Sequence, residues 1–433
     1  MDLLSGAPFW PRKNGLLATY PPLEASLSCD VAIIGGGITG ACVAHELSAA
    51  GCAVVVLDRR DIGTGSTAGS TSLLQYEIDV PLAELAARRG EKSAVRAYRL
   101  GVEAIERIGE LAAGSPFPCG FRTRESVYGA TTLRDAVALR GEYELRRRHG
   151  FAVRFWDRAR VQRESSLPFH AALVSRPAAE IDVHCFTHGL LRRAGVAGAR
   201  VHDRTTVLHC RPQGRGLVLQ TDRGAVVRAR HVVLAAGYEA ESFLPRRATR
   251  LLTTFAIVSE PLAAFPGWPG RRLVWETARP YFYARTTDDR RVIFGGEDEP
   301  FINPRRRERA LPGKVRRLLR RFRQYFPRIP VEPAYAWAGT FAETKDGLPF
   351  IGPHPSLPRT YLALGYGGNG ITFSFVGRGD HPRPVPGAGQ RGCGVVSIWT
   401  AVMPVRAGKS RAGEACTERK RQSAKPKIGN QEI

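Results

Sequence analysis

The sequence lacks any apolar run long enough to span a membrane, and its N-terminus lacks the apolar stretch of a signal peptide. These absences argue against a helical membrane protein, so a cytoplasmic protein with no transmembrane segment is expected. The eight cysteines include no CxxC pair. We therefore expect reduced, mostly structural thiols rather than a zinc ribbon or a redox dithiol.

Clustered metal ligands are also scarce. His184, Cys185 and His188 fall on one face of a predicted helix, and this spacing suits either a metal site or a structural histidine pair. No further ligands lie nearby in the sequence, which favours the structural pair. We predict no metal.

Acidic residues are in deficit: Lys and Arg number 64 against 40 Asp and Glu, which gives a formal net charge of +24. Such an excess can indicate a nucleic-acid or anionic-membrane partner. Here the excess is almost all arginine and is spread along the chain. Its densest stretch, Arg316 to Arg328, has apolar residues at helical spacing. This pattern is typical of an amphipathic surface helix with a solvated face, so no nucleic-acid partner is expected.

The most informative stretch runs from Asp30 to Asp58. An apolar run, Val31 to Ile34, ends in a GxGxxG turn; an alanine-rich helical stretch follows, and a second apolar run ends on Asp58. This is a complete βαβ unit of the dinucleotide-binding type. The chain of 433 residues is long enough for two or three domain-sized units.

Each residue type in that unit has a physical reason. Gly35 permits the tight turn, Gly37 lets a pyrophosphate approach the backbone, and Gly40 lets the helix pack on the sheet. The start of the helix then presents free amides to the phosphates. Asp58 stands where a carboxylate can accept hydrogen bonds from ribose hydroxyls.

Later segments extend this pattern. A run of small and hydroxyl residues, Gly63 to Ser72, suits a loop along a phosphate-bearing ligand. The buried run from His231 to Gly237 looks like a return to the first sheet. Strand-like segments between Leu251 and Gly295 indicate an antiparallel sheet in a second domain. A glycine-rich turn at Gly367–Ile371 offers a second set of backbone amides.

Together these segments resemble the flavin-dependent oxidoreductases of the D-amino-acid oxidase and glycine oxidase family. The resemblance rests on GGGITG with Asp58, GSTAGST, HVVLAAG, TKDGLPFIG and YGGNGI, in this order. It implies FAD and an α/β fold, with a Rossmann-like FAD-binding domain of the glutathione-reductase type. A second, α+β substrate domain would contain an antiparallel sheet over the flavin.

The resemblance also carries site residues over. The ADP half would be held at Gly35, Gly37, Gly40 and Asp58, Ser66 and Thr67 would lie along the pyrophosphate and flavin, and Val207 would pack at the adenine. Amides of the late turn would lie near the flavin O2 edge. The full predicted cofactor set is Gly35, Gly37, Ile38, Thr39, Gly40, Asp58, Arg59, Ser66, Thr67, Val207, Ala235, Ala236, Gly237, Gly367, Gly368, Asn369, Gly370 and Ile371.

The substrate residues depart from the family pattern. Glycine oxidases carry arginines for the substrate carboxylate at two positions where this chain has Phe341 and Gly368. Because a bidentate arginine is the usual partner of an α-carboxylate, a simple amino-acid substrate is in doubt. Arg285 is a candidate substitute or an ordinary surface arginine. The remaining candidates for the pocket are Tyr76, Tyr281, Tyr283 and Tyr366.

The resemblance implies discontinuous domains. Residues 1–28 form an irregular lead-in segment, residues 29–78, 175–245 and 340–377 the FAD-binding domain, and residues 79–174 and 246–339 the substrate domain. From residue 378 the composition changes abruptly. Prolines exclude the expected helix, and four of the chain's eight lysines follow. We therefore interpret residues 378–433 as a disordered tail outside the family pattern.

The predicted function is FAD-dependent oxidation of a C–N bond in an amine or amino-acid-like small substrate by hydride transfer to flavin N5. The electron acceptor would be O2 or a quinone or other carrier. Two alternatives stay open. One is a dehydrogenase of a hydroxy compound resembling glycerol 3-phosphate; the other is a flavin-binding protein impaired by its altered C-terminus.

Overall fold

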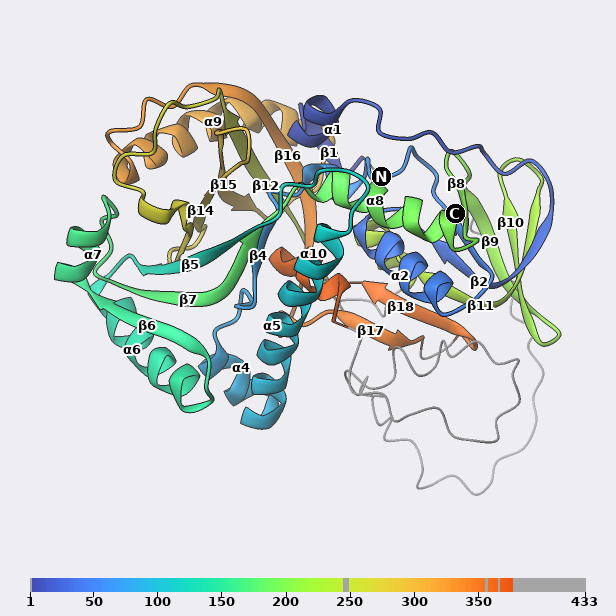
Figure 1. Ribbon diagram of the computed structural model, residues 1–433, viewed down its shortest axis with the longest axis horizontal. Helices are drawn as coiled ribbons and strands as arrows, with labels where there is room; N and C mark the ends of the chain where they lie inside the picture. Colours follow the sequence, from blue (N-terminus) through green and yellow to red (C-terminus); the bar gives the residue numbers. More distant parts are fainter. Residues whose placement is uncertain (1, 244–248, 355–356, 365–366, 377–433) are drawn as a thin grey trace, which may run out of the picture.

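The computed structural model describes residues 2–243, 249–354, 357–364 and 367–376 (Figure 1). This part of the chain forms two large β-sheets that lie next to each other, with helices packed on both. The candidate Tyr366 and the tail 378–433 lie outside the described residues. No helix of the described part is both long and apolar enough to cross a bilayer.

The first sheet contains the predicted βαβ unit. Its parallel strands run in the order β18, β11, β2, β3, β8, and Ile34 stands beside both Leu57 and Leu234 at their carboxyl edge. The predicted return of His231 to Gly237 to this sheet is therefore confirmed. The strands are β2 (Leu27–Ile34), β3 (Val54–Leu57), β8 (Arg200–His202), β11 (Val226–Leu234) and β18 (Thr360–Leu364), with antiparallel β9 (Val207–Gln213), β10 (Gly216–Thr221) and β17 (Phe350–Pro353).

Both faces of the parallel strands are buried, which explains their continuous apolar sequences. Ile33 and Val56 pack toward α2 (Ile38–Ala49) and α8 (Val183–Val196), whereas Ala32 and Val55 face the opposite core. Asp182 caps α8 by accepting from the amides of His184 and Cys185, as its position before the helix predicts.

The second sheet is mostly antiparallel and has ten strands in the order β1, β16, β12, β15, β14, β13, β5, β7, β4, with β6 on β7. The expected antiparallel sheet is present. Its strands are β1 (Leu4–Gly6), β4 (Leu73–Gln75), β5 (Arg122–Ala130), β6 (Ala152–Asp157), β7 (Ala171–Glu180), β12 (Thr249–Ser259), β13 (Leu273–Glu276), β14 (Phe282–Thr286), β15 (Val292–Glu299) and β16 (Pro333–Thr344).

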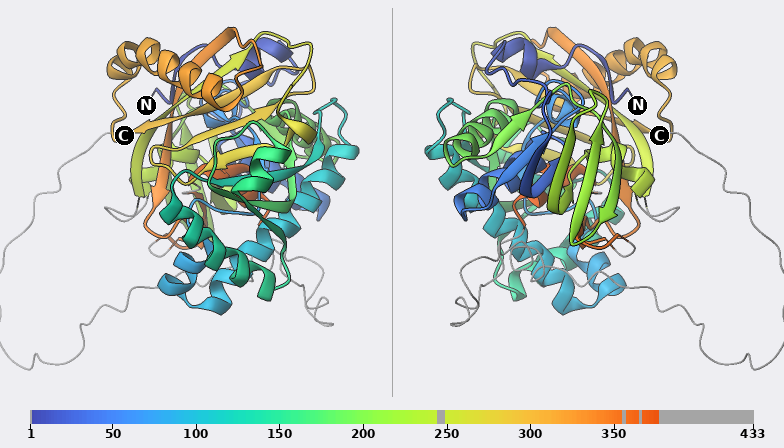
Figure 2. Two further views of the ribbon diagram at one scale, coloured as in Figure 1. Left: turned by 90° about the vertical axis from the view of Figure 1, so that its left-hand side faces the viewer. Right: turned by 90° about the vertical axis from the view of Figure 1, so that its right-hand side faces the viewer.

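Helices cover the outer side of this sheet and the junction between the sheets. The arginine-rich helix α9 lies across β12, β15 and β16 (Figure 2), and it buries Leu318 and Phe322 as its apolar spacing predicts. Helix α9 spans Pro304–Tyr325. The remaining helices are α1 (Phe9–Asn14), α3 (Ser66–Gly69), α4 (Leu82–Arg89), α5 (Glu91–Ala113), α6 (Leu133–Arg148), α7 (Arg158–Glu164) and α10 (Gly370–Ser374), with 3-10 turns η1 (Gly237–Phe243), η2 (Pro269–Arg271) and η3 (Gly367–Asn369).

The N-terminal segment is more regular than the sequence indicates. Residues 4–6 form β1 at the edge of the second sheet, paired with β16, and residues 9–14 form α1. Arg307 on α9 is buried and donates to the Leu3 carbonyl oxygen and to Ser5 Oγ, both at 3.2 Å. A three-residue strand and a six-residue helix are too short to show a hydrophobic period, so the sequence pattern misses them.

Candidate functional site

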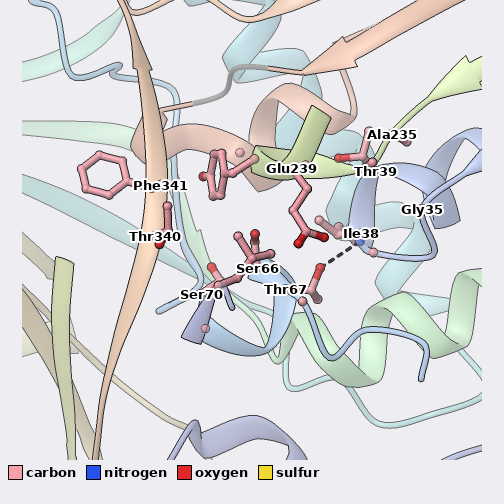
Figure 3. Close-up of a pocket in the computed structure, with 18 of the residues that line it drawn as sticks. Gly35, Ile38, Thr39, Ser66, Thr67, Ser70, Ala235, Glu239, Thr340 and Phe341 are labelled. Atoms are coloured by element: carbon pink, nitrogen blue, oxygen red, sulfur yellow. Dashed lines mark hydrogen bonds between the residues drawn. The ribbon is translucent and has the colours of Figure 1, made fainter. Parts of the chain in front are cut away.

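A cavity of about 570 Å³ lies between the carboxyl ends of the parallel strands and the antiparallel sheet (Figure 3). Its volume falls in the range typical of ligand sites. Figure 3 shows Gly35 and Ala235 toward one end of the cavity and Phe341 at the other. The predicted cofactor residues that line it are Gly35, Gly37, Ile38, Thr39, Asp58, Arg59, Ser66, Thr67, Val207, Ala235, Ala236, Gly237, Gly367, Gly368, Asn369, Gly370 and Ile371.

Gly40 is the one predicted cofactor residue outside the lining, and its role is packing. A Cβ built on Gly40 lies 1.8 Å from the Gly35 carbonyl oxygen, so no side chain fits. Gly35 itself has φ +111°, and a Cβ there lies 2.4 Å from the Ala235 carbonyl oxygen. These two contacts hold the start of α2 close to the ends of β2 and β11, where its amides face the cavity.

The short helix α3 is hydrogen-bonded to the start of α2. The Ile38 amide donates to Thr67 Oγ1 at 3.0 Å (Figure 3), so the hydroxyl satisfies one of the free amides of the α2 terminus. Ser66 Oγ is buried and has no hydrogen-bond partner among the described residues. A buried hydroxyl without a partner is costly unless a ligand supplies one.

Asp58 is fixed at the end of β3. Its Oδ2 accepts from the Gly36 amide at 2.6 Å and its Oδ1 from the Arg60 amide at 2.8 Å, while burial raises the pKa of the carboxyl group. Both bonds come from backbone amides, one in the glycine turn after β2 and one in the loop after β3. They orient a carboxylate at the cavity wall, which fits a ribose hydroxyl as the hydrogen-bond donor.

The sequence pattern misses Glu239, on η1, although it lines the cavity and points into it in Figure 3. Arg60 donates to both of its oxygens, at 2.8 and 2.9 Å, and Arg59 also pairs with it. Burial disfavours its charge, yet the hydrogen bonds from Arg60 lower the pKa of Glu239. The only signal that the sequence offers is that Glu239 follows closely on Ala235–Gly237, the small residues just after β11.

The late glycine turn is tied to the segment after β4. Asn369 Nδ2 donates to the Glu77 carbonyl oxygen at 2.8 Å, and the Gly368 amide donates to Asp79 Oδ2 at 2.9 Å. Tyr238 OH donates to the Gly367 carbonyl oxygen at 3.2 Å. These bonds hold the turn against the cavity, as the resemblance implies.

The far end of the cavity is aromatic. Trp275, Tyr281, Tyr283 and Phe341 come from the antiparallel sheet and its loops, and Asp79 lies at the same end near Gly368. Burial raises the pKa of Tyr283, so its phenol stays neutral at physiological pH. Sequence reasoning found the tyrosines but missed Trp275 and Asp79, because the pairing that brings them together is not encoded in any local pattern.

Two predicted candidates do not reach the cavity. Tyr76 is 1% exposed and stacks on Phe151 with ring centroids 5.4 Å apart. Arg285 is 2% exposed and donates to the carbonyl oxygens of Ser72, at 2.6 Å, and Ile181, at 3.0 Å. Arg285 thus links β14 of the antiparallel sheet to the end of the Gly63–Ser72 segment, and it is neither a surface arginine nor a cation of the cavity.

The histidine pair is buried as well. The rings of His184 and His188 lie with centroids 4.9 Å apart, and burial lowers the pKa of each to about 4. Within the described ranges, no group of three or more potential ligands could hold a metal. Among the described cysteines, the free thiols are Cys29, Cys42, Cys119, Cys185 and Cys210.

Comparison with known proteins gives a consistent answer. A family model described as FAD dependent oxidoreductase matches residues 30–378. Glycine oxidase of Geobacillus kaustophilus (strain HTA426) is 26% identical over 372 residues, covering 80% of this chain and 89% of that protein. Gamma-glutamylputrescine oxidoreductase of Escherichia coli (strain K12) is 27% identical over 376 residues, covering 83% and 84%.

A solved structure shows the same fold. The crystal structure of glycine oxidase from Geobacillus kaustophilus matches with a TM-score of 0.66 at 23% sequence identity, covering 81% of this chain and 92% of that one. The family match spans most of the chain and agrees with the glycine turn, Asp58 and the late turn around one cavity. The chain therefore belongs to the DAO family of FAD-dependent oxidoreductases, enzymes whose cofactor is FAD.

Proposed function

We propose that this enzyme oxidises a C–N single bond of a small amine or amino-acid-like substrate. The observation that carries the proposal is the shape of the cavity, which joins a dinucleotide-binding turn at one end to an aromatic chamber at the other. Two relatives, glycine oxidase and gamma-glutamylputrescine oxidoreductase, are named for amino compounds, which supports the same reaction class.

The residues present fit FAD. No side chain fits at Gly35 or Gly40, so the start of α2 lies close to the strand ends. There its amides face the cavity and could donate to a pyrophosphate. Asp58 would accept from the ribose, and the unpartnered Ser66 Oγ would donate to the pyrophosphate or the ring system. We assign the predicted cofactor set to these contacts, with Gly40 acting through packing.

When bound, the flavin supplies the chemistry by accepting a hydride at N5. The protein positions the substrate and shields the reacting atoms from water. Trp275, Tyr283 and Phe341 would exclude water around the reacting carbon. Amides of the Gly367–Ile371 turn other than that of Gly368, which donates to Asp79, would stabilise negative charge at the far edge of the ring. Tyr281 and Tyr283 are the predicted pocket residues that line the cavity, and as neutral phenols they would orient the substrate rather than deprotonate it.

The hydroxy-compound alternative receives less support. A phosphorylated substrate needs cations at the aromatic end of the cavity. In the described lining, the arginines are Arg59, Arg60 and Arg211, which come from the loop after β3 and from β9 at the nucleotide end. An amine needs no such partner.

The test is a product assay. Purified protein supplied with FAD and an acceptor dye should convert primary alkyl amines, through hydrolysis of the imine by water, into carbonyl compounds and ammonia, and secondary amines into carbonyl compounds and a smaller amine. Matched alcohols and hydroxy acids should give none. Oxidation of the hydroxy compounds alone would overturn the proposal. The electron acceptor, O2 or a quinone-type carrier, stays a prediction, and repeating the assay with each identifies it.

A further inference from the structure

The geometry points to a cationic substrate: we propose that the aromatic end of the cavity selects an amine that carries a positive charge and no carboxylate, with Asp79 as its partner. The inference rests on the proposed function and names the substrate class of the same site.

The first observation is the position of the Asp79 carboxylate. It lies over the late turn, where Oδ2 accepts from the Gly368 amide at 2.9 Å. A Cβ built on residue 368 lies 3.1 Å from both carboxylate oxygens. A negative group therefore occupies the place where the resemblance implies the arginine for a substrate carboxylate. The other such position is Phe341, which is also uncharged.

The second observation is the absence of a counter-charge. Among the residues that the structure describes, none forms an ion pair with Asp79. The nearest arginine contact is Arg279, which donates to the Asp79 backbone carbonyl at 3.3 Å and lies over the Tyr281 ring at 5.0 Å. A half-buried carboxylate without an ion-pair partner at the cavity wall favours a cationic ligand.

The surrounding charges act in the same direction. Asp298 Oδ1 is buried without a hydrogen-bond partner. Burial and then the charges of Asp79 and Glu343 raise the pKa of Asp298 to about 7. Burial and Asp79 likewise raise the pKa of Glu343, with Arg250 opposing. Part of each rise comes from the charge of Asp79, so this carboxylate sets up a negative potential beside the cavity although the net charge of the chain is +24.

The third observation is independent of charge. Trp275, Tyr281, Tyr283 and Phe341 line the same end, and the rings of Tyr281 and Tyr283 lie 5.8 Å apart between centroids. Ring faces attract ammonium groups through their quadrupoles, most strongly in desolvated sites. Aromatic rings around one carboxylate are a recognised way of binding ammonium ions, whereas a carboxylate ligand gains nothing from them.

A binding experiment tests this in the FAD-loaded protein. Benzyltrimethylammonium is the cationic probe, since its nitrogen has no lone pair and cannot be oxidised to an iminium ion; benzoate is the anionic probe. Calorimetric titration should show benzyltrimethylammonium binding at least about 10-fold more tightly than benzoate. Asp79→Asn should weaken benzyltrimethylammonium by about 10-fold or more and leave benzoate equal or tighter.

The matched control is Glu110→Gln, a carboxylate whose side chain is 68% exposed on α5, and it should change neither affinity. Equal or tighter benzoate binding by the unaltered protein would overturn the inference, as would an Asp79→Asn affinity for the cation within twofold. Should Asp79→Asn lose FAD or fail to fold, the two probes on the unaltered protein decide the question.

The outcomes also separate this inference from the proposed function. Amine oxidation with cation binding that ignores Asp79 would sink the inference alone. Cation binding that depends on Asp79, without oxidation of any amine, would sink the proposed function and leave the cavity's preference established.

Discussion

At Gly40 a single methyl group would collide with the backbone, because a Cβ there lies 1.8 Å from the Gly35 carbonyl oxygen. The sequence alone identifies this glycine through its spacing. It predicts that Gly40 lets the helix pack on the sheet, and the Cβ contact agrees, because no side chain fits between α2 and the end of β2.

We predict that Gly40→Ala loses most bound FAD and destabilises the protein by roughly 3 kcal/mol, because the backbone must shift to admit the methyl group. Flavin absorbance per chain and urea unfolding measure the two effects. Gly141→Ala is the control: it lies in α6 with nothing within 4 Å of the new Cβ, so it should be neutral or slightly stabilising.

Asp298 gives a pH-dependent prediction. Its pKa is raised to about 7 in the folded protein, first by burial and then by the neighbouring Asp79 and Glu343, against an ordinary value of 3.8. The folded state therefore keeps the proton where the unfolded state has lost it. Stability should fall as the pH rises from about 4 to about 7, and Asp298→Asn should remove this fall.

Since Asp298 retains partial exposure, the expected gain of Asp298→Asn over the unaltered protein is roughly 1–2 kcal/mol at pH 8 and near zero at pH 4. Denaturant unfolding across this range measures it. Asp61→Asn, with a side chain 72% exposed, should show no such trend. A gain that is equal at both pH values would argue against the raised pKa.

Among the structural elements, α3 depends on distant parts of the chain. Trp10 on α1 donates from Nε1 to the Ser70 carbonyl oxygen at 2.7 Å, Trp337 on β16 to the Gly69 carbonyl oxygen at 2.9 Å, and Arg285 to Ser72. Three buried donors thus fix the loop that carries Ser66 and Thr67. The hydroxyl-rich sequence predicts this loop but says nothing of its donors.

We expect Trp10→Phe to weaken FAD binding by roughly 3- to 10-fold, because the ring stays while the buried Ser70 carbonyl loses its donor. Fluorescence titration of apoprotein with FAD measures the change. Trp156→Phe is a matched control, since its Nε1 is buried without a partner and its removal should cost little. Equal losses in both variants would contradict the role of Trp10.

The elements themselves were predictable where a period or a turn signal is strong. The βαβ unit, α9 and the Asp182 cap of α8 follow from local sequence. The short strands β1 and β4 do not, and neither does the pairing of β1 with β16 over 300 residues away. Local patterns encode the faces of an element; which distant strand it joins depends on the packing of the whole chain.

At the scale of the whole molecule, the candidate site is formed where the two sheets lie against each other. The parallel sheet supplies the glycine turn and Asp58, the antiparallel sheet supplies the aromatic chamber, and the cavity spans both (Figures 1 and 3). All the predicted cofactor residues except Gly40 line this cavity, because each motif is local, and their contacts with FAD stay a prediction. The aromatic end gathers residues from β12, β13, β14, β16 and the segment after β4, so Tyr281 and Tyr283 were predicted but Trp275 and Asp79 were visible only in the structure. The division into discontinuous domains at the stated boundaries stays a prediction.

The most direct test of the account is an anaerobic titration of the purified, FAD-loaded enzyme with primary and secondary alkyl amines, followed through the visible flavin band. The account predicts one FAD per chain and bleaching by at least one amine, with the colour restored when an electron acceptor is admitted. A protein that binds no flavin after reconstitution, or a flavin that hydroxy compounds bleach and amines do not, would contradict it.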